Sequence, residues 1–243
     1  MKELIKVNNL IVKRSTAFAL EIEGFEAQAG KITCITGPNG SGKTTFIETL
    51  IGLLQPTSGR VLMNGQEVSR NLKQNKKLIG FIPDDEEWFI KGLSAGEYFK
   101  LLASVYSSAG VGSDMNKATI NLAKKLHFTA FDQLIGQLSH GNRKKVQIIA
   151  GLMHKPKIVI VDELRNGLDP IAIIEAERII KDCIASGAAV ITTTHDLWWA
   201  ERIADDLMLL IDGKPALQDS TKAVVHRYKH IETAFMKLTG MDK

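Results

Sequence analysis

The stretch Gly37-Pro38-Asn39-Gly40-Ser41-Gly42-Lys43-Thr44 decides the fold of this 243-residue chain. It matches the pattern GxxxxGK followed by Ser or Thr, whose glycines let successive backbone N–H groups close around phosphate oxygens. A β-rich run at 31–36 precedes it and a helical run at 45–54 follows it, as the pattern requires. We therefore expect these residues and Thr45 to bind the phosphates of a nucleotide, because the helix presents its positive end to the loop. Lys43 would reach the β- and γ-phosphates, and Thr44 would ligate Mg²⁺.

Two acids follow another apolar run of the sequence. The expected strand 157–161 ends in Asp162-Glu163, and ligands bind at the carboxyl ends of strands in open α/β sheets. Beside a phosphate loop, Asp162 is the natural carboxylate for Mg²⁺, and Glu163 is placed to polarise the attacking water. Simple capping of a strand end is the alternative interpretation.

Short β-rich runs alternate with segments of helical periodicity, which predicts an α/β fold. The expected strands are 31–36, 60–63, 157–161, 188–193 and 207–211. Between about residues 84 and 138 apolar residues recur at helical spacing instead, as at Leu101, Leu102 and Val105. We therefore expect a helical insertion in an α/β core. An amphipathic helix is expected near the end of the chain, at 220–238.

The composition is that of an ordinary globular domain, with 44% hydrophobic and 24% charged residues. The apolar runs are far shorter than the roughly 18 residues of a spanning helix, and the first residues carry acid and amide side chains, so we expect a cytoplasmic protein. The net charge of +4 comes from short clusters such as 143–145, which we interpret as solvated surface, and nucleic acid is not an expected partner. Cys34 and Cys183 lack metal-site spacing and are expected to be buried, reduced thiols.

Three further motifs follow the phosphate loop. The segment Leu138-Ser139-His140-Gly141-Asn142 and the basic run after it resemble the LSGGQ signature of ABC ATPases. Residues 164–170 are similar to the D-loop of that family, and the strand at 188–194 delivers His195, which matches its switch histidine. The chain therefore resembles the ATP-binding subunit of an ABC transporter, most of all the bacterial export-type ATPases of the ABC-2 group.

The resemblance implies a fold and a set of ligands. The fold is one ABC-type P-loop NTPase domain over 1–243 with an N-terminal antiparallel β portion. Its core would comprise 1–84 and 139–219, its inserted α-helical subdomain about 85–138, and its C-terminal helix about 220–243. The expected ligands are ATP and Mg²⁺. The expected activity is ATP hydrolysis coupled to transport, with export favoured, through a separate transmembrane permease subunit at the inner face of the cell membrane.

The resemblance also implies a dimer, most simply of two copies of this chain. In that family each ATP lies between the phosphate loop of one subunit and the signature of the other. Ser139 and Gly141 would then contact the γ-phosphate held by the opposite subunit, and Asp169 would cross the interface. His195 would bind the γ-phosphate and orient the water. A helix beginning at Ser139 supports this role, because its unpaired N–H groups and positive dipole end suit an anion.

Several positions depart from the pattern of the family. Asp84 stands where most members have glutamine, and as a hard oxygen ligand it is expected to bind Mg²⁺. His140 replaces a glycine of the signature. Arg14 stands where an aromatic side chain stacks on adenine; its guanidinium plane can stack on a base, and Phe18 is the alternative.

Trp88, Phe89 and Ile90 follow a run of acids at 84–87, at the entry to the helical insertion. The resemblance places this segment beside the groove that receives a short cytoplasmic helix of the membrane subunit. We expect at least one of the three side chains to be exposed, and packing inside the helical subdomain is the alternative for each.

Other interpretations stay open. An ATPase of iron–sulphur cluster assembly has comparable length, and a binding module with a defunct site would also account for Asp84 and His140. His226 and His230 have an i, i+4 spacing that can bind metal, although a solvated helix face is the preferred interpretation.

Overall fold

The computed structural model describes residues 2–14, 18–68, 73–85, 87–108 and 114–241. Its strands are β1 (Glu3–Lys13), β2 (Ala19–Gln28), β3 (Ile32–Thr36), β4 (Ser58–Met63), β5 (Gln66–Glu67), β6 (Ile79–Ile82), β7 (Ile158–Asp162), β8 (Ala189–Thr193), β9 (Asp206–Ile211) and β10 (Lys214–Ser220). Its helices are α1 (Lys43–Leu50), α2 (Lys73–Lys76), α3 (Ala95–Ser108), α4 (Met115–Lys125), the 3-10 turn η1 (Ile135–Gln137), α5 (His140–Leu152), α6 (Pro170–Ala185), α7 (Leu197–Ile203), α8 (Thr221–Tyr228) and α9 (Ile231–Thr239).

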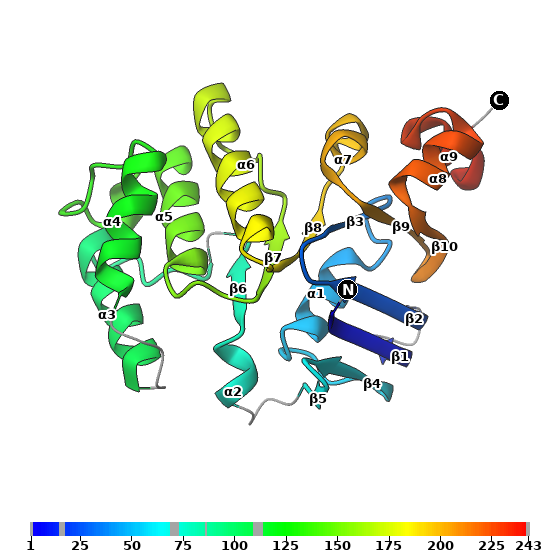
Figure 1. Ribbon diagram of the computed structural model, residues 1–243, viewed down its shortest axis with the longest axis horizontal. Helices are drawn as coiled ribbons and strands as arrows, with labels where there is room; N and C mark the ends of the chain where they lie inside the picture. The colour runs from blue at the N-terminus through cyan, green and yellow to red at the C-terminus, as the bar shows by residue number, and fades with distance from the viewer. Residues whose placement is uncertain (1, 15–17, 69–72, 86, 109–113, 242–243) are drawn as a thin grey trace.

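Within the described residues these strands form two sheets. A four-stranded antiparallel sheet has the order β2-β1-β4-β5, and a six-stranded sheet has the order β10-β9-β3-β8-β7-β6. In the larger sheet β9, β3, β8, β7 and β6 are parallel, and β10 returns antiparallel to β9. Figure 1 shows α3, α4 and α5 at one end of the molecule and the antiparallel sheet near the other. The expected α/β core with an N-terminal antiparallel portion is confirmed.

The parallel strands of the larger sheet are largely buried on both faces, which positions their carboxyl ends. Every residue of β3 is buried, as in a strand covered on both sides. One cluster of buried side chains joins both sheets to α1, where Phe25 of β2 meets Phe46 of α1 edge to face at 5.1 Å between ring centroids. A second cluster joins β7 to α3, α4, α5 and α6. The loops that follow the parallel strands therefore lie together at one edge of the sheet.

The predicted strands coincide with β3, β4, β7, β8 and β9 to within two residues at each end. β1 and β2 are not delimited by the sequence pattern. In β1 the backbone of Asn9 has a φ of 48°, and the register against β4 shifts between Asn8 and Ile11. This irregularity interrupts the alternation by which a strand is recognised.

The helical insertion begins later than its sequence indicates. A capping box starts α3: Ser94 N donates to Glu97 Oε2 at 2.8 Å, and Glu97 N donates to Ser94 Oγ at 3.2 Å. The residues 88–93 before it are not helical, so the expectation of a helix there is wrong. Leu101 and Val105 of α3 are 41% and 54% exposed, because other side chains of that helix form its buried face.

The expected single helix at the C-terminus is also wrong, because the chain forms α8 and α9 instead. Lys229 has a φ of 72°, which ends α8. Glu201 of α7 then accepts hydrogen bonds from Ile231 N at 2.8 Å and from the His230 ring at 3.0 Å, which fixes the start of α9. His226 and His230 therefore share no helix face. In the described part of the chain no three His, Cys, Asp or Glu side chains are grouped to hold a metal.

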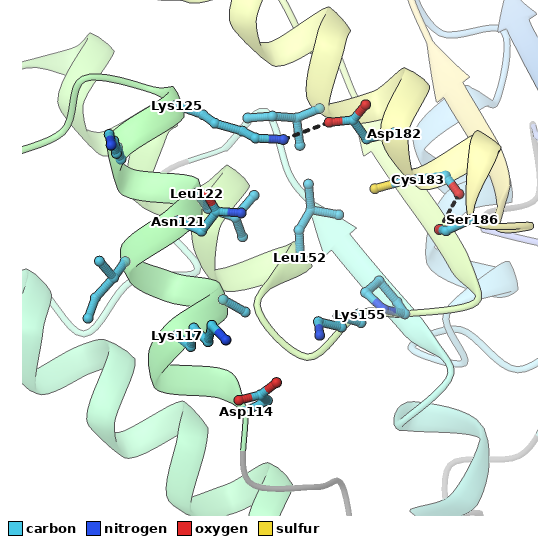
Figure 2. A pocket seen from close by; sticks show the side chains of 15 residues that line it. Asp114, Lys117, Asn121, Leu122, Lys125, Leu152, Lys155, Asp182, Cys183 and Ser186 are labelled. Atoms are coloured by element: carbon cyan, nitrogen blue, oxygen red, sulfur yellow. Dashed lines mark hydrogen bonds and ion pairs between the residues drawn. The ribbon is translucent and has the colours of Figure 1, made fainter.

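A hollow of about 650 Å³ lies between α4 and the C-terminal half of α6 (Figure 2). Lys125 of α4 donates to Asp182 of α6 at 2.6 Å, and both side chains are exposed enough that such a pair contributes only about 0.2–1 kcal/mol. Cys183 lines the hollow, and burial raises the pKa of its thiol to about 11. Both cysteines are free thiols; Cys34 is buried, as expected, whereas Cys183 is only half-buried. No helix of the described residues has the length and apolar character needed to cross a membrane.

Candidate functional site

The loop between β3 and α1 has the geometry that its glycines allow. Gly42 has a φ of 105° and occupies the N-cap position of α1. Gly37 admits no side chain, because a Cβ there would lie 2.1 Å from the carbonyl oxygen of Leu210. These two positions let the loop close tightly before the helix, with the first N–H groups of α1 directed toward the loop.

Lys43 closes the loop on itself. Its Nζ donates to Gly37 O at 2.8 Å and to Pro38 O at 3.1 Å. Burial lowers the pKa of Lys43, and the carboxylates of Glu163 and Asp162 oppose that shift. The ammonium group is therefore held at the loop by carbonyl oxygens, which phosphate oxygens can replace as stronger, charged acceptors.

Asp162 and Glu163 lie where β7 ends. The hydroxyl of Thr193, on the neighbouring strand β8, donates to Asp162 Oδ1, and burial raises the pKa of Asp162. Glu163 adopts a φ of 49°, in the left-handed region that residues with a Cβ rarely occupy. Strained backbone of this kind concentrates at functional sites.

His195 approaches Glu163 from the end of β8. Its Nδ1 lies 3.0 Å from Glu163 Oε1, a distance at which the ring N–H donates to the carboxylate. This bond leaves Nε2 of the imidazole for another partner. The His195 side chain is 72% exposed, whereas that of Glu163 is only 14% exposed, so the histidine covers the carboxylate from the solvent side.

Asp84 follows β6 and is held by Asn166 of the D-loop-like segment and Lys144 of the basic run after the signature, neither of which was expected in the site. Asn166 Nδ2 donates to both carboxylate oxygens of Asp84, at 3.1 and 3.2 Å. Lys144 Nζ lies 3.8 Å from Asp84 Oδ1 and donates to Pro83 O at 2.9 Å and to Asp162 O at 3.2 Å. Burial lowers the pKa of Lys144 to about 8, and the nearby carboxylates oppose that shift.

The burial of Lys144 corrects the interpretation of residues 143–145 as solvated surface. Only 2% of its surface is exposed, because it lies on the side of α5 that faces β6, and its Nζ reaches the end of β7 at Asp162 O. The available signal was its spacing: Lys144 shares a helix face with the buried Ile148. A cluster of basic residues in the sequence does not by itself show which of them lies on the buried face of a helix.

One cavity of about 440 Å³ gathers most of the predicted residues. It is lined by Arg14, Phe18, Asn39, Gly40, Ser41, Gly42, Lys43, Thr44, Thr45, Asp84, Asp162 and Glu163. At its rim Arg14 forms an ion pair with Glu48 of α1 at 3.2 Å. Phe18 lies against Gly42, where an added Cβ would be 3.1 Å from its ring. Both candidates for contacting the base therefore line this cavity.

The donor set of the cavity fits Mg²⁺ bound together with phosphate. Thr44, Asp84 and Asp162 bring hydroxyl and carboxylate oxygens to one cavity, and these are the hard ligands that Mg²⁺ prefers. Mg²⁺ keeps several waters and is commonly held by one or two carboxylates plus substrate phosphates.

Ser139, Gly141 and Asp169 do not line this cavity. Ser139 caps α5 by accepting from Asn142 N at 3.3 Å, and Asp169 caps α6 by accepting from Ala172 N at 2.9 Å. This bond lowers the pKa of the Asp169 carboxyl. The start of α5 contacts the D-loop, since a Cβ at Gly141 would be 2.9 Å from Gly167 O.

Comparisons with known proteins point to one family. The sequence profile of the ABC transporter family matches residues 21–166. The lantibiotic transport ATP-binding protein SrtF of Streptococcus pyogenes is 30% identical over 217 residues, which cover 88% of this chain and 90% of that protein. The lipopolysaccharide export system ATP-binding protein LptB of Acidithiobacillus ferridurans is 25% identical over 228 residues, which cover 93% of each. A solved ATP-binding subunit of an ABC transporter superposes with a TM-score of 0.89 at 25% identity, covering 97% of this chain and 99% of that chain.

Proposed function

The chain is a member of the ABC transporter family, and from that premise we propose that it hydrolyses ATP to drive transport through a separate transmembrane permease. The observation that carries the proposal is the single cavity that joins the phosphate loop to Asp162 and Glu163. Relatives named for lantibiotic transport and lipopolysaccharide export support export as the direction. The association with a permease would hold the subunit at the inner face of the membrane.

Binding of the nucleotide is assigned to the phosphate loop, residues 37–45. The loop N–H groups and Lys43 bind the phosphates, and the interaction of Lys43 with its own loop carbonyls is exchanged for phosphate oxygens. Thr44, Asp162 and Asp84 are the residues that would hold Mg²⁺, which supplies neutralisation of charge on the phosphate oxygens. Arg14 or Phe18 contacts the base.

Hydrolysis is assigned to Glu163 and His195. The Glu163 carboxylate accepts a proton from the attacking water or orients it, which is general-base chemistry. His195 keeps that carboxylate oriented through the 3.0 Å contact, and its Nε2 is left to bind the γ-phosphate. Catalysis here is mainly positioning of the water and stabilisation of charge.

A second subunit completes the site. Ser139, Gly141 and Asp169 lie outside the cavity of their own chain, which supports a role on ATP held by a second copy. Ser139 and Gly141 stand at the N-terminal end of α5, where the helix dipole favours an anion. Asp169 would cross the interface between the two subunits.

The permease is proposed to dock where the helical subdomain, about 85–138, meets the core, 1–84 and 139–219. An apolar hollow of about 270 Å³ opens there, lined by Ile51, Leu53, Lys76, Ile79, Phe81, Tyr98, Leu102, Tyr106, Ala150 and Gly151. Trp88 packs edge to face on Phe81 at 5.4 Å and is still 45% exposed. Aromatic side chains at such a rim suit the apolar face of an amphipathic helix.

Replacement of Glu163 by Gln tests the assigned chemistry. The amide keeps the size of the side chain but cannot accept the proton, so turnover of Mg²⁺-ATP should fall about 100-fold or more while nucleotide affinity is kept. The measurement is phosphate release together with ATP binding on the purified protein. Turnover close to that of the unmodified protein would remove Glu163 from this role, and absence of ATPase activity in both would refute the proposed function.

A further inference from the structure

Lys144 carries an ammonium group into the interior of the protein, directly behind the cavity. Lysine is almost never fully buried unless its charge is compensated, since an unpaired buried charge is costly. Its contacts are the carbonyl oxygens of Pro83 and Asp162 and, at 3.8 Å, the carboxylate of Asp84. The charge of Lys144 is therefore directed at the carboxyl ends of β6 and β7.

These contacts tie three elements together at one point. β6 and β7 are neighbouring parallel strands, and Pro83 and Asp162 stand at corresponding ends of them. One helical turn beyond Lys144, Gln147 donates to Asp85 O at 2.7 Å. The helix α5 thus forms hydrogen bonds to the backbone on both sides of Asp84 and holds that segment against the end of β7.

The ammonium group of Lys144 balances negative charge that surrounds the cavity. The carboxylates of Asp84, Asp162 and Glu163 all line the cavity that is to receive a polyanion. Among the described lining residues the positive charges are those of Lys43 and Arg14, and Arg14 is paired with Glu48. Without Lys144, Lys43 would face three carboxylates and the phosphates together.

We propose that Lys144 is a positioning residue of this site, one that holds Asp84 toward the phosphate cavity and compensates its negative charge, so that a polyanionic nucleotide can bind beside three carboxylates. The inference rests on the proposed function. It assigns to the Asp84–Lys144 pair a joint role, in which the charge of one residue is needed because of the charge of the other.

The test is binding of ATP in EDTA, which reports charge in the cavity without any metal ion. Lys144→Met keeps an unbranched side chain one atom shorter and removes its charge, so the Kd for Mg²⁺-free ATP should rise about tenfold or more. Asp84→Asn alone should lower that Kd about threefold or more, because Lys144 keeps its charge and loses its counter-charge. The double variant Asp84→Asn, Lys144→Met should return to within about threefold of the unmodified protein, since the two charges cancel.

Lys157→Met is the matched control. Lys157 is exposed and precedes β7 at its opposite end, so the same loss of charge should leave the Kd unchanged within about twofold. Thermal melts of each variant check folding. Should Lys144→Met fail to fold, Asp84→Asn still keeps the inference open to refutation, because an unchanged or raised Kd in that variant overturns it.

Two outcomes separate this inference from the proposed function. If the unmodified protein binds and hydrolyses ATP, and the folded Lys144→Met variant binds ATP equally well in EDTA, then only the role of Lys144 is refuted. A double variant as weak as Lys144→Met alone refutes the joint role, since a purely structural lysine would not be rescued by a change at Asp84. Absence of ATP binding by the unmodified protein refutes both.

Discussion

In the proposed function, recognition of the base is assigned to single residues at the rim of the cavity. The Arg14 guanidinium is paired with Glu48, and its side chain is 46% exposed, so it is held at the rim with its surface partly free. Phe18 lies beside Gly42 and is half-buried. A guanidinium stacks on any base and reads no particular edge of it, so stacking alone discriminates weakly.

We therefore expect loose base selectivity, with GTP and ATP binding within about 100-fold of each other. A competition titration with both nucleotides measures it, and Arg14→Ala and Phe18→Ala show which side chain contributes. GTP binding more than 100-fold weaker than ATP binding would mean that another group reads adenine through hydrogen bonds.

At the scale of elements, the apolar side chains of the segment before α3 differ in their exposure: one is packed inside the protein and two are at the surface. Phe89 is 9% exposed and meets Tyr98 of α3 edge to face at 5.8 Å. Trp88 and Ile90 are 45% and 50% exposed. The expectation that at least one of the three is exposed is confirmed, and packing inside the helical insertion applies to Phe89 alone.

Trp88→Ala should abolish co-purification with the permease while the melting temperature and basal ATPase activity are kept. Phe89→Ala should lower stability by about 3–5 kcal/mol, as expected when a buried aromatic side chain is removed. The pair distinguishes docking from packing. Retained co-purification of a folded Trp88→Ala variant would show that the permease docks elsewhere.

A buried histidine, His154, lies close to the junction of α5 with β6, and its titration links the stability of the protein to pH. His154 is 5% exposed, bonds to Ile79 O at 2.9 Å and stacks on Tyr106 of α3 at 4.0 Å. Burial lowers its pKa to about 4. Since this folded-state pKa lies below the ordinary value near 6.5, the unfolded chain binds more protons between those pH values, and stability falls as the pH is lowered through them.

His154 should therefore account for up to about 3 kcal/mol of stability lost between pH 6.5 and 4. His154→Gln keeps an N–H donor for Ile79 O and removes the titration, so its unfolding free energy should depend less on pH across that window. Urea unfolding at several pH values measures both slopes. Parallel slopes for the two proteins would mean that His154 does not titrate on unfolding.

For the whole molecule, the proposed dimer places the start of α5 against a nucleotide held by another copy. Ser139 and Ser220 are matched in their local role: each caps a helix by accepting from a backbone N–H at 3.3 Å, in α5 and α8 respectively. Loss of either cap costs about 1 kcal/mol of stability. Only Ser139 belongs to the signature segment.

In a Glu163→Gln background we expect ATP to produce a dimer, measured by light scattering after size exclusion. Adding Ser139→Ala should weaken that dimer about tenfold or more, because one contact to phosphate is lost, whereas adding Ser220→Ala should leave it unchanged. Equal dimerisation of the two variants would assign Ser139 to capping alone.

The sequence by itself determines the loop at 37–44, the acids at the end of β7 and the family, because each motif consists of residues close together in the chain. The glycines at 37 and 42 are required by backbone geometry that no other residue meets. Such local patterns can be recognised in the sequence without knowledge of the fold.

Only the tertiary structure decides which polar groups are buried and what they meet. Lys144 belongs to a basic cluster in the sequence, yet the ends of β6 and β7 enclose its ammonium group. Asn166 reaches Asp84 across 82 positions of the chain, and Glu201 of α7 fixes the break between α8 and α9. Contacts between residues so far apart follow from how the elements pack, and no local periodicity records them.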